Sequence, residues 1–414
     1  MSILGEEIAA LIRTEGPLPV SRYMGLCLGH PRHGYYITRD PLGTAGDFTT
    51  APEISQIFGE LIGLWAAHVW QAMGAPATVR LVELGPGRGT LMADILRAAK
   101  VLPAFRAAIE VHLVETSPVL RATQARALEG VGAVWHEDVS AALDGPAIVI
   151  ANEFLDALPV DQFVRTEEGW RERLIGLGEG GELAWGLGSI LAVEPQRTPS
   201  PLVGEGRGEG SRDASDLSFQ ASEAKQRDPS SVPASPGHLL PQGEKESAPI
   251  GAIYEHPQAA LDVVASVSRH VAGCGGGALF IDYGSIESGV GDTLQAMRAH
   301  EFVDPFADPG EADLTVHVDF ARMGQAARAA GAATHGPAAQ RDFLLSLGLA
   351  ERAQALARRA SEAQRETILK GAERLVAPGP TEMGDLFKVM ALSHPDLPPL
   401  PGFDRHLLPE QLSR

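Results

Sequence analysis

Residues 79–96 combine a short apolar run, a glycine-rich turn and the start of an amphipathic helix. The run ends at Leu84 and is followed by Gly85-Pro86-Gly87-Arg88-Gly89, after which Thr90 opens a pattern with apolar residues on one face. The length of the run is that of a buried strand. Glycines let the backbone turn sharply, and the free N–H groups of a helix start can face a ligand. The stretch predicts a nucleotide-binding unit; the alternative is an ordinary strand–helix connection.

The spacing of the glycines decides which ligand fits. A dinucleotide-binding turn has the pattern G-x-G-x-x-G or G-x-G-x-x-A, but Thr90 stands at its third position. The chain has a third glycine at Gly89 and a carboxylate, Glu83, on the strand, which gives E-x-G-x-G-x-G. This pattern resembles motif I of class I S-adenosylmethionine (SAM) methyltransferases. The Glu83 carboxylate suits the ammonium group of the methionine part of SAM, directly or through water.

Acidic side chains also end the next two predicted strands. Glu115 ends a strand predicted over 109–115, and Asp138 ends one predicted over 133–138. Strands that alternate with helices favour a parallel, doubly wound sheet, in which ligands bind at the carboxyl ends of the strands. Glu115 can there accept both ribose hydroxyls, and Asp138 suits the adenine amino group. The alternative for each acid is a helix cap or a salt bridge.

Three further strands extend the predicted sheet. Residues 145–152 form an apolar run that ends in Asn152, and its pattern indicates burial on both faces. Residues 277–284 predict a fifth strand, with Asp282 near its end. Residues 384–392 predict a closing strand at an antiparallel edge.

Composition restricts the classes of partner and site. The net charge of −19 disfavours nucleic acid as a partner. The two cysteines, Cys27 and Cys274, lie far apart without a Cys/His cluster, so we expect no structural metal and no disulfide framework. No apolar run approaches the ~20 residues that span a bilayer, so we expect no membrane insertion. The N-terminal segment resembles neither a signal peptide nor a transit peptide, and we therefore expect a cytoplasmic protein.

The chain divides into four predicted regions. Residues 1–76 predict a helical N-terminal region on the substrate side, and 77–194 the first part of the SAM-binding core. Residues 195–249 are dominated by proline, glycine, serine and charge. Such a segment buries too little apolar surface to offset its chain entropy, so we expect a disordered insertion. Residues 250–414 then complete the core and add helical, substrate-side elements.

Deletion of residues 197–247 is expected to leave folding and activity largely intact, because the segment contributes no apolar periodicity to the core. Thermal unfolding and SAM titration of the deletion variant, beside the full chain, test this expectation. Aggregation of the variant, or a loss of its SAM affinity, contradicts it.

Several long sequence blocks resemble the MidA-type methyltransferase family, which includes an arginine methyltransferase of mitochondrial complex I assembly. They are E-L-G-P-G-R-G-T-L, G-D-F-T-T-A-P-E-I-S at 46–55, A-N-E-F-L-D-A-L-P-V-D-Q-F from residue 151, D-P-x-x-x-P-G-E-x-D-L-T-x-H-V-D-F and M-G-D-L-F-K-V-M. The resemblance covers nearly the whole chain except 195–249. It implies an α/β, Rossmann-like class I fold with a mostly parallel seven-stranded sheet. The implied activity is protein arginine N-methylation, linked to assembly of NADH dehydrogenase, with a 49-kDa-type subunit as the substrate.

The resemblance also assigns roles to residues. Glu83, Gly85, Gly87 and Gly89 would hold the methionine part of SAM, Glu115 the ribose and Asp138 the adenine side. Asn152, Glu153 and Asp156 would face the methyl acceptor. The substrate-side candidates in the N-terminal loop are Asp47, Phe48, Thr49 and Glu53.

An arginine acceptor explains why carboxylates would stand beside it. The guanidinium group has a pKa above ~12 and cannot simply be deprotonated. Carboxylates that fork onto it can orient it and localise its charge away from the attacking nitrogen. Glu153 and Asp156, three residues apart beyond the fourth predicted strand, suit this role. The alternative is that the two acids cap the following helix.

Two other functions stay open on sequence alone. The first is methylation of a small molecule or of another protein side chain. The second is a non-catalytic assembly module that keeps the fold and binds a partner. A module of that kind is expected to have lost the glycines or the strand-end acids that bind SAM. A SAM titration therefore separates the module from the two enzymes.

Overall fold

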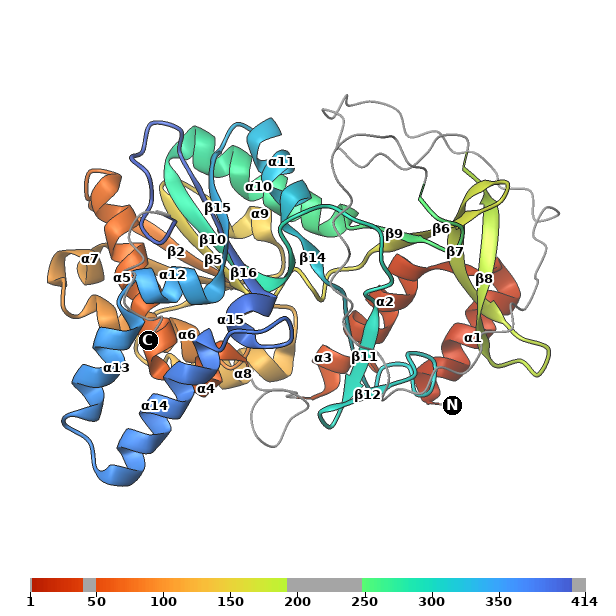
Figure 1. Ribbon diagram of the computed structural model, residues 1–414, viewed down its shortest axis with the longest axis horizontal. Helices are drawn as coiled ribbons and strands as arrows, with labels where there is room; N and C mark the ends of the chain where they lie inside the picture. The colour runs from red at the N-terminus through yellow and green to blue at the C-terminus, as the bar shows by residue number, and fades with distance from the viewer. Residues whose placement is uncertain (1, 40–49, 192–247, 404–414) are drawn as a thin grey trace. The chain divides into compact units, whose positions relative to one another are not determined.

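The computed structural model of the protein describes residues 2–39, 50–191 and 248–403. The chain forms two compact units, each assembled from three separate segments (Figure 1). The smaller unit comprises 1–39, 157–261 and 288–317, and the larger unit comprises 40–156, 262–287 and 318–414. The region boundaries predicted from the sequence stay a prediction. Most of the predicted insertion, residues 195–247, lies outside the described residues.

The larger unit is built on one sheet of eight strands. Seven follow one another in the order β4–β3–β2–β5–β10–β16–β15, and β14 pairs with β10. The strands are β2 (Val79–Leu84), β3 (Ile109–Val114), β4 (Val134–His136), β5 (Ala147–Asn152), β10 (Gly276–Ser285), β14 (Val318–Asp319), β15 (Ala333–Ala339) and β16 (Phe387–Ser393).

The strand directions confirm the α/β class. Strands β4, β3, β2, β5 and β10 are parallel to their neighbours in this series, and β14 is parallel to β10. Strand β16 runs antiparallel to both β10 and β15, which confirms the predicted antiparallel edge. The expected count of seven strands is not confirmed, because β14 adds an eighth. That strand has two residues, too few to produce a periodic sequence pattern.

The two faces of this sheet carry different apolar sets because side chains alternate along a strand. Leu81, Ile150 and Leu279 belong to one core cluster with residues of the helices α5 (Gln56–Ala72), α6 (Thr90–Ala99), α12 (Gln340–Ser346), α13 (Leu349–Ala357) and α14 (Glu362–Val376). The alternate positions, such as Val149 and Phe280, are also fully buried but lie outside that cluster. Figure 1 shows the helices α10 (Gln258–Cys274) and α11 (Phe320–Ala329) on this second side of the sheet.

Helix α5 packs closely on α6 because two glycines of α5, Gly59 and Gly63, face α6. Ser55 caps the start of α5, where its hydroxyl accepts a hydrogen bond from Ile57 N. A Cβ on Gly59 would lie 2.5 Å from the Cβ of Asp94, so a larger residue would push the helices apart. The helices of the larger unit are α4 (Ala51–Ile54), α5 (Gln56–Ala72), α6 (Thr90–Ala99), α7 (Pro103–Ala108), α8 (Pro118–Ala127), α9 (Val139–Ala142), α11 (Phe320–Ala329), α12 (Gln340–Ser346), α13 (Leu349–Ala357), α14 (Glu362–Val376) and α15 (Met383–Leu386).

The smaller unit holds two antiparallel sheets and short helices. In the first sheet the order is β1–β7–β6–β9, with β8 on β7; the second has the order β12–β11–β13. Helix α10 (Gln258–Cys274) begins in this unit and continues into the larger one. The other elements are α1 (Ile3–Glu15), β1 (Leu18–Pro19), α2 (Val20–Gly29), α3 (Tyr35–Thr38), β6 (Asp161–Thr166), β7 (Gly169–Leu177), β8 (Leu183–Ile190), β9 (Ile253–His256), β11 (Gln295–Arg298), β12 (Glu301–Val303) and β13 (Asp313–Thr315).

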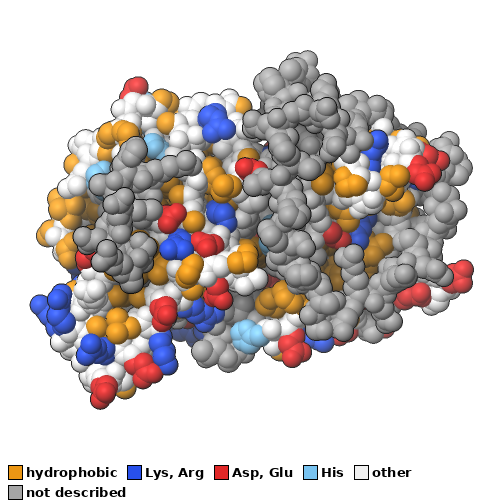
Figure 2. Space-filling view, viewed as in Figure 1, with side chains coloured by type: hydrophobic (Ala, Val, Ile, Leu, Met, Phe, Trp, Pro, Cys, Tyr) orange, Lys and Arg blue, Asp and Glu red, His pale blue; other side chains and the backbone are white. Residues whose placement is uncertain are grey.

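Two further observations concern the charge on the surface and the length and apolar character of the helices. Figure 2 shows Lys and Arg side chains interspersed with Asp and Glu over α13 and α14, so the two signs of charge mix there. Within the described part of the chain, no helix has both the length and the apolar character required to cross a bilayer.

Candidate active site

One edge of the larger unit's sheet gathers polar side chains from neighbouring parallel strands. Glu83 lies in β2, Glu115 directly follows β3, Asn152 ends β5 and Asp282 lies near the end of β10. All four side chains are buried. A buried carboxylate is costly unless it is protonated, hydrogen-bonded or paired with a cation. The concentration of such groups at the carboxyl ends of the strands marks this edge as the candidate site.

The turn between β2 and α6 has a backbone that favours glycine. Gly85, Gly87 and Gly89 have φ angles of +61°, +53° and +82°, in the left-handed region that other residues rarely adopt. A Cβ at position 85 would lie 2.8 Å from Cδ2 of Phe154, in the turn after β5. The glycine turn therefore lies directly against the turn that carries the predicted acceptor residues. The role of the glycines in binding the methionine part of SAM stays a prediction.

Glu83 has the property expected of a residue that binds a cationic group. Its side chain is only 3% exposed, and no described residue forms a hydrogen bond with its Oε2 atom. Burial raises the pKa of this carboxyl to about 8, and the Met92 N–H lowers it in part. A buried carboxylate oxygen without a partner fits the ammonium group of SAM, which would supply both the missing donor and the opposite charge.

Glu115 is held by donors on both of its carboxylate oxygens. Ser117 N donates to Oε1 at 2.8 Å, and Gln124 Nε2 donates to Oε2 at 3.1 Å. Burial raises the pKa of this carboxyl, while the Ser117 and Gln124 hydrogen bonds act in the opposite direction. Each carboxylate oxygen accepts about two hydrogen bonds, so both oxygens can still accept a ribose hydroxyl.

Asp138 is exposed and already caps a short helix. Its Oδ1 accepts from Ala141 N at 2.9 Å and also from the Ser140 hydroxyl, and these two bonds are the main causes that lower the pKa of its carboxyl. The structure therefore shows the helix cap that the sequence left open as the alternative. The predicted contact of Asp138 with adenine stays a prediction.

Glu153, the first residue after β5, has an unusual backbone and a well-defined set of partners. Its φ of +51° is rare for a residue with a side chain. Its Oε1 accepts from Ala51 N at 3.1 Å and from Asn152 Nδ2 at 2.9 Å. Burial, followed by the nearby charge of Asp156, raises the pKa of the carboxyl to about 7, against the effect of these hydrogen bonds. Glu153 therefore changes charge near neutral pH.

Asp282 holds the turn that contains Glu153 and Asp156. Its Oδ2 accepts from the backbone N–H groups of Phe154, Leu155 and Asp156 at 3.2, 2.9 and 3.2 Å. Burial raises the pKa of Asp282 well above its usual value, and the charges of Asp156 and Glu153 raise it further. The charges of three carboxylates thus act on one another at this edge of the sheet, an arrangement that favours a cation. The sequence places Asp282 at the ligand edge of the sheet but does not indicate its role, which is to hold this turn.

The segment after the N-terminal loop connects the glycine turn with Glu153. At the start of α4, Ala51 N donates to Glu153, and Glu53 Oε1 accepts from the Thr90 hydroxyl at 2.5 Å. Glu53 was predicted on the substrate side, and in the structure it contacts the first residue of α6. Its role toward the substrate stays a prediction. The other three substrate-side candidates, Asp47, Phe48 and Thr49, lie outside the described residues.

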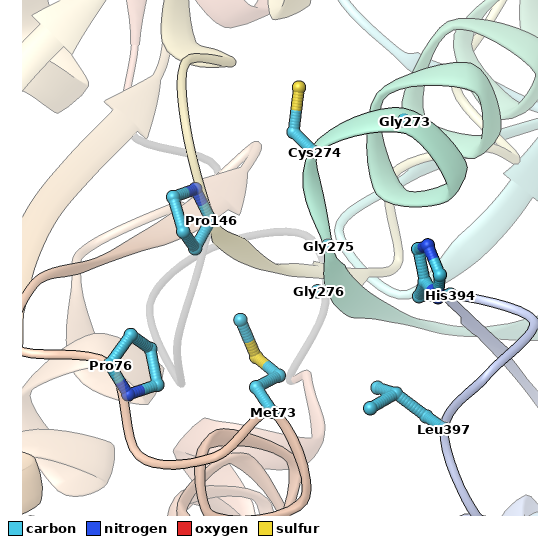
Figure 3. Close-up of a pocket in the computed structure, with 9 residues that line it drawn as sticks. All are labelled: Met73, Pro76, Pro146, Gly273, Cys274, Gly275, Gly276, His394 and Leu397. Atoms are coloured by element: carbon cyan, nitrogen blue, oxygen red, sulfur yellow. The ribbon is translucent and has the colours of Figure 1, made fainter.

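A separate hollow of about 350 Å³ lies in the larger unit, away from these acids (Figure 3). It borders the starts of β5 and β10, at the amino-terminal edge of the sheet, and is lined by Met73, Pro76, Pro146, Gly273, Cys274, Gly275, Gly276, His394 and Leu397. None of these nine residues is acidic, so the hollow lacks the carboxylates that characterise the opposite edge.

Comparisons with known proteins show the family to which the chain belongs. Residues 61–338 match the family described as "Putative S-adenosyl-L-methionine-dependent methyltransferase". The chain is 34% identical over 432 residues to the mitochondrial protein arginine methyltransferase NDUFAF7 homolog of Drosophila melanogaster, covering 97% of this chain and 88% of that protein. It is 34% identical over 409 residues to NDUFAF7 of Mus musculus, covering 92% and 82%.

A solved structure resembles the whole chain. It is the crystal structure of a protein from Burkholderia thailandensis, described as a "likely methyl transferase", bound to S-adenosyl-homocysteine. The TM-score is 0.74 and the sequence identity is 26%. The match covers 97% of this chain and 94% of that one.

The expected cytoplasmic location is wrong on these comparisons. The curated relatives from Drosophila melanogaster, Mus musculus and Homo sapiens are all named as mitochondrial proteins. That expectation relied on the character of the N-terminal segment and on the two cysteines, which together are insufficient ground for a location.

Proposed function

Because the chain belongs to this family of SAM-dependent methyltransferases, we propose that it transfers a methyl group from SAM to the guanidinium group of an arginine in a protein. The chain is a methyltransferase whose cofactor is SAM. The arginine acceptor is supported by the relatives, which are named protein arginine methyltransferases. The strand order of the larger unit, with β16 antiparallel, supports its assignment to the Rossmann-like class I SAM-methyltransferase fold.

The observation that carries the proposal is the group of buried and partly buried carboxylates beside the glycine turn. Glu153 and Asp156 lie on the turn after β5, and Phe154 between them contacts the glycine turn at Gly85. When bound, SAM supplies a methyl group on a positively charged sulfur. Glu83 and the glycine turn would hold its methionine part, and Glu115 its ribose. The acceptor carboxylates would then lie next to the cofactor.

The acceptor residues would orient a guanidinium group and remove a proton from it. Glu153 and Asp156 can each accept hydrogen bonds from its N–H groups, which also neutralises its charge. The Asn152 side chain directs its N–H toward Glu153 and fixes that carboxylate. Glu153 then accepts the proton that the attacking nitrogen loses as its bond to the methyl carbon forms and the sulfur–methyl bond breaks. Alignment of this kind supplies up to ~7–11 kcal/mol of the barrier reduction.

The protein substrate that we propose is a 49-kDa-type subunit of NADH dehydrogenase, as the family resemblance implies. Incubation of radiolabelled SAM with a lysate from cells that lack this enzyme tests the proposal once the purified protein is added. We expect one labelled polypeptide near the size of that subunit. Label in small molecules only would contradict a protein acceptor, and absence of any label beside intact SAM binding would favour a non-catalytic module.

A further inference from the structure

Gln124 lies where the glycine turn, the end of β3 and the strand β4 meet. It is a residue of α8, and its side chain has no exposed surface. Its Nε2 donates to the carbonyl oxygen of Gly87 at 2.7 Å and to Glu115 Oε2 at 3.1 Å. Its Oε1 accepts from Trp135 Nε1 at 2.8 Å. One amide thus joins the turn after β2, the end of β3 and the strand β4.

These contacts use both N–H groups of the amide. An apolar residue of similar size would fill the same volume without the cost of burying an amide, which is considerable unless every bond is made. We therefore attribute the presence of glutamine at this position to its hydrogen bonds and not to the packing of its side chain. Two of those partners are groups predicted to bind SAM: Gly87 in the glycine turn and the carboxylate of Glu115.

We propose that Gln124 is a positioning residue that holds the glycine turn and the Glu115 carboxylate in the relative arrangement that binds one SAM molecule. The inference rests on the proposed function, in which Glu115 accepts the ribose hydroxyls. Ser117 N donates to one carboxylate oxygen, and the Gln124 side chain donates to the other. Without Gln124 the carboxylate can turn about its last torsion and no longer presents both oxygens to the ribose.

The same contact favours the ionised form of Glu115. Burial raises the pKa of this carboxyl, and the hydrogen bond from Gln124 is among the interactions that lower it. An ionised carboxylate accepts two hydroxyl groups, whereas a protonated one has fewer acceptor positions. Loss of Gln124 is therefore expected to weaken SAM binding most at mildly acidic pH.

A comparison of two ligands on two proteins tests the inference. The ligands are S-adenosyl-homocysteine and its analogue without the 2′ and 3′ ribose hydroxyls, and the proteins are the natural chain and Gln124→Met. A hydrogen bond to a charged group is worth about tenfold or more in affinity. The natural chain is thus expected to prefer the hydroxylated ligand by ~100-fold, and Gln124→Met by less than ~10-fold. At saturating SAM, kcat of the variant should stay close to that of the natural chain.

A purely structural role would lower the affinity for both ligands equally, and an unchanged preference in Gln124→Met overturns the inference. Trp135→Phe is a milder second variant, since it removes the donor to Gln124 Oε1, with part of the indole ring, and leaves the Gln124 amide in place; it should reduce the same preference by a smaller factor. Thr123→Ala is the control, because that hydroxyl contacts Val119 and Arg126 of its own helix. If the natural chain binds neither ligand, the proposed function itself fails, which is a different result.

Discussion

Glu83→Gln is expected to lower the affinity for SAM at least a hundredfold and at the same time to stabilise the free protein. Glu83 is buried, and its Oε2 has no hydrogen-bond partner among the described residues. The variant would lose the negative charge that we expect to face the SAM ammonium group, at a cost of about 3 kcal/mol or more, which is at least a hundredfold in affinity. Calorimetric titration with SAM measures this loss.

The gain in stability follows from the raised pKa of Glu83, about 8 in the folded protein. A carboxyl whose pKa is raised by folding contributes stability below its unfolded pKa, and this contribution is lost as the pH rises through the folded pKa. The free protein should therefore become less stable from about pH 4.5 to pH 8. By pH 7 roughly 3 kcal/mol of the Glu83 contribution has been lost, and the variant should lack this pH dependence.

Chemical denaturation of both proteins without SAM, at pH 5 and pH 7, measures the effect. Glu110→Gln, an exposed position on the adjacent strand β3, is the matched control and should change neither property. If Glu83→Gln binds SAM as tightly as the natural chain does, Glu83 does not contact the SAM ammonium group.

Glu153→Gln is expected to lower kcat by about 10²–10⁴-fold, the usual contribution of a general base, with little change in SAM affinity. Gln has nearly the same shape and can keep the hydrogen bond from Ala51 N, but it cannot accept a proton. In the natural protein the rate should rise with pH through about 7, where Glu153 becomes ionised. This rise should be absent in the residual activity of the variant.

A pH–rate profile of both proteins, with SAM binding measured in parallel, tests this expectation. Glu129→Gln is the matched control, since Glu129 is exposed after α8. A variant that keeps the natural rate and the natural pH profile would show that Glu153 is not the base. A parallel loss of SAM binding would instead indicate a structural role for the turn.

The parts of the site that are local in sequence could be predicted. The strand, the glycines and Glu83 lie within a few residues of one another, and the pattern alone indicates a ligand turn. The acid after β3 was found in the same way, because parallel strands end at the same edge. The α/β class followed from the alternation of strands with helices.

Contacts between distant segments could not be predicted. Asp282 reaches across to a turn more than a hundred residues earlier, and Gln124 reaches the glycine turn from α8. No periodic pattern carries such information. The left-handed backbone of Glu153 was also not foreseen, because a residue other than glycine rarely adopts it. The closing strand predicted over 384–392 begins only at Phe387, because the residues before it form the helix α15. Four residues suffice for one helical turn, which is too short to produce a periodic sequence pattern.

The identity of the methylated residue tests the central claim most directly. The polypeptide labelled by this enzyme from radiolabelled SAM is hydrolysed to amino acids, and the labelled species is separated and identified. We predict methylated arginine with the natural enzyme and a strongly reduced yield with Glu153→Gln, which still binds SAM. Label in any other amino acid, or an equal yield of methylated arginine from both proteins, would contradict the role proposed for the carboxylates after β5.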